Sequence, residues 1–202
     1  MAMAQVEAAV VIHLRTVYYG DDPLTLFPIA LLSDRDLVIE LSRELATMLM
    51  ILSVALLQSR RSTQVFGAFL YVFGVWDIAY YAWLKLFLGW PTQWLQWDVL
   101  FLIPWPWLGP WMTPVFVSLL FIAAGTRLLA SPARFTRLAL SLLVAGAALV
   151  VIAFLLPVLL VPVDRQASIE PGDFLWSVFV PGYVLMAYGL GIACRGGAWR
   201  AA

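Results

Sequence analysis

Four charged residues lie well inside segments that are mostly apolar. Glu40, Arg43 and Glu44 belong to the stretch LVIELSREL, and Asp77 belongs to the stretch YVFGVWDIAYYAWLKL. A charged side chain in the hydrocarbon of a membrane costs about 2.5 kcal/mol or more, so each of these residues needs a partner or a function. Spacings of three and four residues place Glu40, Arg43 and Glu44 on one face of a helix. They are the first candidates for acid–base chemistry in the chain.

These residues are expected to meet at one depth in the membrane. At the rise of a helix, Arg43 and Glu44 lie about 14–15 Å from the outer end of their segment, and Asp77 lies about 16 Å from the outer end of the next. A short loop joins the two segments, which makes them antiparallel neighbours. We therefore predict an Arg43–Asp77 ion pair, with Glu44 or Glu40 completing a network in the outer half of the membrane.

The predicted cluster holds more acids than bases. Three carboxyl groups meet Arg43, while Lys85 lies nearer the surface and is expected to extend its ammonium group to the interface. Low dielectric and a neighbouring like charge both favour the protonated form of one surplus carboxyl. Such a group serves as a proton donor, a proton relay or a cation ligand. We assign Glu44, Asp77 and Arg43 as candidate catalytic residues; the alternative is that these charges only hold the helices together.

Tryptophan and proline are concentrated in the segment 89–111, GWPTQWLQWDVLFLIPWPWLGPW. It contains six of the ten tryptophans, and its prolines interrupt it too often for an ordinary spanning helix. We expect an interfacial or re-entrant segment that forms an aromatic wall above the acid cluster. A membrane-interface belt or a docking surface for a partner subunit are the alternatives. The candidate ligand-binding residues are Glu40, Tyr80, Tyr81, Trp76, Trp97, Asp98 and Trp105.

The elements that must position these residues are membrane helices. Hydrophobic residues make up 63% of the 202 residues and charged residues 12%, against about 45–50% and about 25% in soluble domains. We predict an all-α, polytopic helical bundle that forms a single integral-membrane domain over residues 1–202. Five segments are long and apolar enough to span a membrane: 33–58, 64–88, 112–129, 137–161 and 174–194. Ser33 is the expected N-cap of the first, with an acidic residue three positions later.

The N-terminal segment 1–32 has an apolar run that is too short to span. We expect it to form an amphipathic helix on the outer side, lying on the membrane or packing on the protein.

Basic residues predict the orientation of the chain. They follow the first span, join the third to the fourth and follow the fifth: Arg60, Arg61, Arg127, Arg134, Arg137, Arg195 and Arg200. Regions rich in arginine stay in the cytoplasm, whereas the alternate loops, 89–111 and 162–173, lean acidic. We predict a multi-pass protein of a bacterial inner membrane, with its N-terminus outside and its C-terminus in the cytoplasm.

Residue counts exclude several kinds of site. The single Cys194 excludes an intramolecular disulfide and a multi-cysteine metal site. The single His13 excludes bis-histidine haem ligation and metal sites built on several imidazoles. We therefore expect no metal and no cofactor, and the absence of a basic run argues against nucleic acid as a partner.

The favoured hypothesis is an outward-facing pocket, acidic and aromatic, that binds or transforms an amphiphilic or isoprenoid-like small molecule by acid–base chemistry. Proton-initiated cyclisation of a polyene is one reaction that needs an acid among aromatic rings. The alternatives are a non-catalytic accessory subunit of a membrane complex and a proton- or cation-coupled transport component. The expected partners are membrane lipid, a lipid-like ligand, and a second membrane protein or further copies of the chain.

Overall fold

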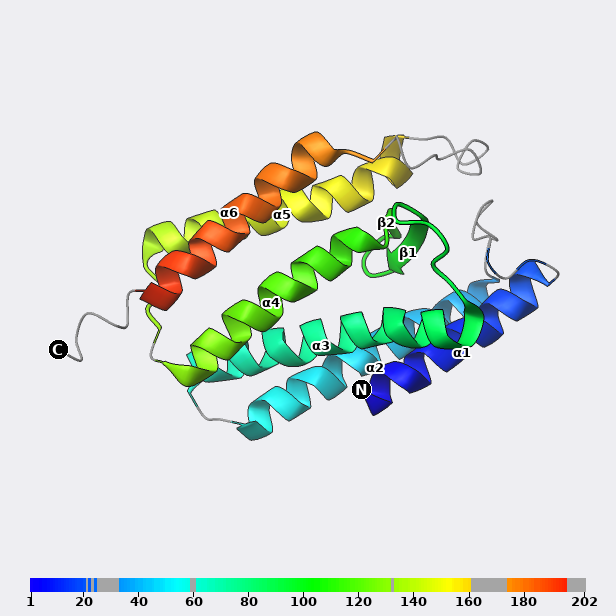
Figure 1. Ribbon diagram of the computed structural model, residues 1–202, viewed down its shortest axis with the longest axis horizontal. Helices are drawn as coiled ribbons and strands as arrows, with labels where there is room; N and C mark the ends of the chain where they lie inside the picture. The colour runs from blue at the N-terminus through cyan, green and yellow to red at the C-terminus, as the bar shows by residue number, and fades with distance from the viewer. Residues whose placement is uncertain are drawn as a thin grey trace. The chain divides into compact units, whose positions relative to one another are not determined.

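The computed structural model describes residues 1–20, 22, 24, 33–58, 61–131, 133–160 and 174–195. These described residues form six α-helices and two β-strands (Figure 1): α1 Ala2–Tyr19, α2 Asp34–Gln58, α3 Ser62–Leu88, β1 Trp97–Phe101, β2 Trp107–Pro110, α4 Met112–Ala130, α5 Arg137–Leu160 and α6 Trp176–Arg195. The helices α3, α4, α5 and α6 are long and apolar enough to cross a membrane. Arg60, Arg200 and the acidic loop 162–173 lie outside the described residues.

Helix α2 begins as its N-cap sequence indicates. The backbone N–H of Asp36 donates to the Ser33 hydroxyl at 3.2 Å, and that hydroxyl donates to the Asp36 carboxylate at 2.7 Å. The predicted cap is thus confirmed. Six of the first eleven residues of α2 are charged, and α2 is not among the four helices that meet the length and hydropathy criteria for crossing a membrane. That α2 forms a fifth span stays a prediction.

The chain divides into two compact units, each assembled from segments that are far apart in the sequence. Unit 1 consists of Met1–Ala46, Val75–Val115 and Phe154–Phe174. Unit 2 consists of Thr47–Gly74, Phe116–Ala153 and Leu175–Ala202. Helices α2, α3, α4 and α5 each contribute residues to both units.

In unit 1, α1 packs along the last turns of α3. Ala8, Tyr81, Leu84 and Trp90 form a buried cluster at this contact, and Figure 1 shows α1 running beside the first part of α2 and the end of α3. Gly89 ends α3 with a φ of 75°, and its N–H donates to the Lys85 carbonyl at 3.1 Å. A residue in this left-handed conformation is a common helix terminator, and glycine adopts it without steric strain.

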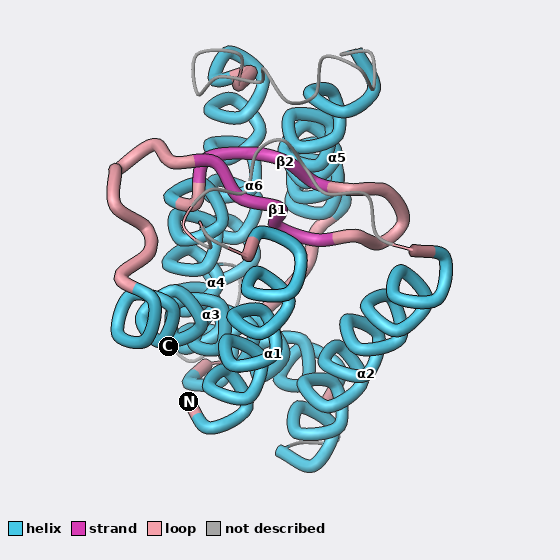
Figure 2. The backbone as a smooth tube through the Cα atoms, turned by 90° about the vertical axis from the view of Figure 1, so that its right-hand side faces the viewer, coloured by secondary structure: helices cyan, strands magenta, loops and turns pink. Residues whose placement is uncertain are grey.

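The segment after α3 contains a β-hairpin, which the all-α prediction did not include. Strands β1 and β2 are antiparallel, with Asp98 opposite Gly109 and an irregularity in register between Val99 and Phe101 (Figure 2). A two-stranded hairpin needs only short runs of residues, and proline is tolerated at its ends and on its edges. The prolines that argue against a spanning helix are therefore compatible with this hairpin.

Unit 2 is held together by close helix packing. A Cβ atom on Gly125 of α4 would lie 2.5 Å from the carbonyl oxygen of Gly67 in α3, and one on Gly146 of α5 would lie 2.6 Å from that of Gly182 in α6. Figure 1 shows α5 and α6 side by side. Small residues at helix contacts let the backbones approach closely, which is typical of helices packed in membranes.

Candidate functional site

Unit 1 contains a cavity of about 350 Å³. Its lining comes from α1, α2, α3, the hairpin and Val158 of α5, all within the same unit. The polar part of the lining consists of five carboxylic acids, two arginines and four tyrosines: Glu7, Glu40, Glu44, Asp77, Asp98, Arg15, Arg43, Tyr18, Tyr19, Tyr80 and Tyr81. Aliphatic side chains complete the wall, including Val11, Leu14, Leu37 and Leu100. Charged side chains are rarely buried in proteins, so the number of them that line this cavity is unusual.

Most of the residues that the sequence predicts for the site line this cavity. Those that do are Glu40, Arg43, Glu44, Trp76, Asp77, Tyr80, Tyr81 and Asp98. Trp97 and Trp105 are not in the lining. Trp97 is buried, and its ring packs edge-on to Phe174 at 5.9 Å. Trp105 lies between the two strands and is exposed.

Arg43 is held by carboxylates from two helices. Its Nε and Nη2 atoms donate to Glu40 Oε2 at 2.8 and 2.7 Å, and Glu7 of α1 also pairs with it. Asp77 lines the same cavity, but the ion pairs that the structure gives Arg43 are those with Glu40 and Glu7. The predicted Arg43–Asp77 pair stays a prediction.

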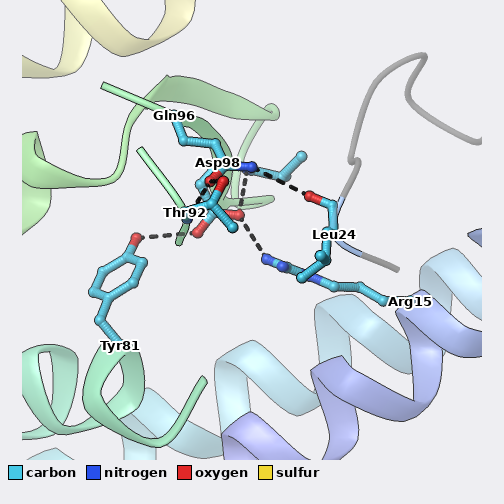
Figure 3. A network of polar contacts seen from close by, with 7 residues as sticks. Arg15, Leu24, Tyr81, Thr92, Gln96 and Asp98 are labelled. Carbon is cyan, nitrogen blue, oxygen red and sulfur yellow. Dashed lines mark hydrogen bonds and ion pairs between the residues drawn. The ribbon is translucent and has the colours of Figure 1, made fainter. Parts of the chain in front are cut away.

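Asp98 is the centre of a second polar network (Figure 3). Arg15 Nη2 donates to Oδ1 at 3.1 Å, the Tyr81 hydroxyl donates to Oδ2 at 3.1 Å, and the Val99 N–H donates to Oδ1 at 3.0 Å. Burial raises the pKa of the Asp98 carboxyl, while the charge of Arg15 and the hydrogen bond from Tyr81 lower that pKa in part. The network joins α1, α3 and β1, so it positions the hairpin on the two helices.

Glu44 contacts the hairpin directly. Both of its carboxylate oxygens accept the Leu102 N–H at 3.0 Å, just after β1 ends. Glu44 therefore positions the chain between the two strands, whatever chemistry it performs. Its predicted role as a catalytic acid is compatible with this contact, because a carboxyl group has more lone pairs than one N–H uses.

Two further polar contacts fix the start of the segment that carries the hairpin. Lys85 Nζ donates to the carbonyl oxygens of Gly89 and Pro91 at 2.9 and 2.8 Å, and it is not in the cavity lining. Gln96 accepts from the Thr92 N–H at 2.7 Å and donates to the Leu24 carbonyl at 3.2 Å (Figure 3). These contacts link the aromatic segment to the end of α3 and to the residues after α1.

The sequence prediction missed the contribution of α1. Glu7, Arg15 and Tyr18 all line the cavity. With Val11 they are spaced by four, four and three residues, so they share one helix face. That spacing was a usable signal, but the same amphipathic pattern also fits a helix lying on a membrane surface.

The arrangement is suited to proton transfer and to binding hydroxyl or carbonyl groups. Carboxyl groups accept or donate protons according to their ionisation, and guanidinium and tyrosine hydroxyl groups donate hydrogen bonds. Within the described ranges, no group of three or more His, Cys, Asp or Glu side chains is placed to hold a metal ion.

Comparison of the chain with protein-family models, with curated proteins and with solved structures finds no match. The fold and the cavity define the class: a mostly helical protein in which four of the described helices are long and apolar enough to cross a membrane, with a charged cavity inside one of its two units. Because a fold alone does not define a function, the function must be inferred from the chemistry of the cavity.

Proposed function

We propose that unit 1 binds an amphiphilic, lipid-like small molecule in its cavity and transforms it by acid–base chemistry. One observation carries the proposal: five carboxyl groups, two guanidinium groups and four tyrosines line the same cavity as a series of aliphatic side chains. A wall of this kind offers an apolar surface to a hydrocarbon and hydrogen-bonding groups to a head. Small-molecule sites have this mixture of an apolar lining and a few convergent polar groups.

Glu44 is the strongest candidate for the acid. Among the described residues, the ion pairs of the cavity join Arg43 to Glu7 and Glu40, and Arg15 to Asp98. Glu44 instead accepts a neutral N–H, so its charge is less fully compensated. A carboxyl group in that position takes up a proton more readily than one that faces a guanidinium directly. Asp77 is the second candidate because it lines the same cavity.

The location proposed for the site is the outer side of a bacterial inner membrane. Support comes from the distribution of arginine in the loops and from the four helices that are long and apolar enough to cross. With α2 as the predicted fifth span, this orientation places the N-terminus and α1 outside and the C-terminus in the cytoplasm.

Mass spectrometry of the protein purified in a mild detergent tests the binding part. Leu14→Trp places an indole in the cavity, whereas Val17→Trp adds the same group to an exposed position of the same helix. We expect the wild-type protein and Val17→Trp to retain a lipid-like molecule and Leu14→Trp to lose it. If all three proteins carry the same molecules in the same amounts, the cavity is not the binding site.

Deuterium incorporation tests the chemical part. The copurified molecule is incubated with the protein in deuterated water, and its mass is followed. Loss of a general acid typically reduces a rate by about 100-fold or more, so Glu44→Gln or Asp77→Asn should reduce incorporation by that factor. Asp34→Asn is the matched control, because Asp34 belongs to the same helix α2 but is exposed and is not in the cavity lining. Equal incorporation in all variants rejects acid–base chemistry at these residues.

A further inference from the structure

Arg15 has hydrogen-bonding capacity that the protein leaves unused. One nitrogen atom, Nη2, donates to Asp98, and the guanidinium lies 4.2 Å from the centre of the Trp90 ring. Its Nε and Nη1 atoms are buried and make no hydrogen bond within the part of the chain that the structure describes. Only 3% of the side chain is exposed to solvent. A guanidinium carries five N–H groups, and buried donors normally have acceptors.

The second arginine of the cavity is different. Arg43 contacts two carboxylates, Glu40 and Glu7, so acids of the protein itself engage it. Its side chain is also more exposed, at 20%. Both arginines line the cavity. In the described part of the chain, Arg15 has two nitrogen atoms, Nε and Nη1, without a hydrogen-bond acceptor, whereas Arg43 Nη1 pairs with Glu7.

The charges that line the cavity determine which kind of hydrogen-bond acceptor a ligand can bring to Arg15. Five carboxyl groups face two guanidinium groups, so an anionic head group would meet surplus negative charge. A cationic head group would meet the guanidinium of Arg15. A neutral carbonyl oxygen accepts N–H groups without adding charge, and hydroxyl groups beside it can donate to the carboxylates.

We propose that Arg15 binds the ester carbonyl oxygen of a neutral lipid whose head also has hydroxyl groups, as in a monoacylglycerol. The inference rests on the proposed function, because it names the head group of the ligand in the same cavity. Val11 and Leu14 line the cavity on the same helix as Arg15 and provide an apolar surface for the acyl chain. A volume of about 350 Å³ accommodates the head and the first part of a chain, at the lower end of the roughly 300–1,000 Å³ of small-molecule pockets.

Binding of four probes with the same alkyl chain tests this assignment: monolaurin, dodecyl glyceryl ether, dodecanoate and dodecyltrimethylammonium. Monolaurin and the ether differ in one carbonyl oxygen. Affinity is measured on the full chain in a neutral detergent by the change in tryptophan fluorescence, since Trp76 lines the cavity. We expect the ester to bind about 10-fold or more tightly than the ether, the factor for one hydrogen bond from a charged donor. Dodecanoate and dodecyltrimethylammonium should bind more weakly than the ester.

Two variants assign the preference to Arg15. Arg15→Lys keeps a cation for Asp98 but lacks the planar fork of donors, and Arg15→Met with Asp98→Leu removes both charges together. Each should reduce the ester-to-ether ratio to about one, and the infrared band of a ¹³C-labelled ester carbonyl should move to higher wavenumber than in the wild-type complex.

Three results would overturn the assignment. They are equal affinity for ester and ether in the wild-type protein, tighter binding of either ionic probe, and an ester preference that survives in both variants. Leu14→Trp separates this failure from failure of the proposed function. If it abolishes binding of every probe while the ester preference is absent, the cavity is a lipid site with a different head group. If it changes nothing, the cavity is not a lipid site.

Discussion

The two units of this chain use different means to keep their helices together. In unit 1, ion pairs and hydrogen bonds join α1, α2, α3 and the hairpin around a cavity. In unit 2, the buried cluster is apolar, and glycines let the helix backbones approach each other. The stability of unit 1 therefore depends on polar groups that pair with one another. The stability of unit 2 depends on how closely its helices pack.

The two units also differ in the spectroscopic groups that report on them. Eight of the ten tryptophans belong to unit 1: Trp76, Trp83, Trp90, Trp94, Trp97, Trp105, Trp107 and Trp111. The single cysteine, Cys194, is buried in unit 2. Tryptophan fluorescence therefore follows unfolding mainly in unit 1, and the rate of thiol labelling follows exposure of Cys194 in unit 2.

The largest expected effect comes from separating Arg15 from Asp98. Asp98→Leu leaves a buried guanidinium without its carboxylate, and breaking one side of a buried ion pair typically lowers the free energy of unfolding by about 3–5 kcal/mol. Removing both charges, with Arg15→Met added, should restore most of that stability, because no uncompensated charge remains. Thermal unfolding in detergent, followed by tryptophan fluorescence, gives both values. If Asp98→Leu alone is as stable as the wild-type protein, the Arg15–Asp98 pair does not stabilise unit 1.

The helices of both units follow from patterns that are local in the sequence. Long apolar runs predict α3, α4, α5 and α6, and the predicted span 64–88 ends at the same residue as α3. The hairpin was missed because its two strands, WDVLF and WLGP, do not alternate regularly between apolar and polar residues. Without that alternation, a short run of residues cannot be told from an irregular segment.

The candidate site is predictable only in part, since side chains from distant segments meet there. The spacing of Glu40, Arg43 and Glu44 indicates a shared face, and all three line the cavity. The ion-pair partners of Arg43 and Asp98 could not be predicted in this way. Glu7 and Arg15 come from a helix whose amphipathic pattern says which residues share a face but not which surface that face meets.

A second prediction concerns two glycines of α6 that are two residues apart. A Cβ on Gly189 would lie 2.9 Å from the Ala139 carbonyl oxygen and from the Leu143 nitrogen, whereas a Cβ on Gly191 would have no atom within 4 Å. Gly189→Ala should therefore lower the free energy of unfolding by about 1–3 kcal/mol, the usual effect of overpacking. Gly191→Ala should leave it unchanged or raise it slightly, because alanine restricts the unfolded chain. Labelling of Cys194 measures both, and equal rates in the two variants would contradict close packing as the main stabilising factor in unit 2.

The smallest expected effect tests whether Glu44 holds the hairpin through its charge. Glu44→Gln keeps a carbonyl oxygen for the Leu102 N–H but replaces a charged acceptor with a neutral one, so unit 1 should lose about 1 kcal/mol of stability. Glu44→Leu removes the acceptor and should lose more, with faster hydrogen exchange at the Leu102 amide. Tryptophan fluorescence should detect both changes, and the Cys194 labelling rate should change less. If Glu44→Gln instead raises stability, then burial of the charge outweighs its hydrogen bond. Glu44 would then be a residue whose position costs stability, which is expected of a group kept for chemistry rather than for folding.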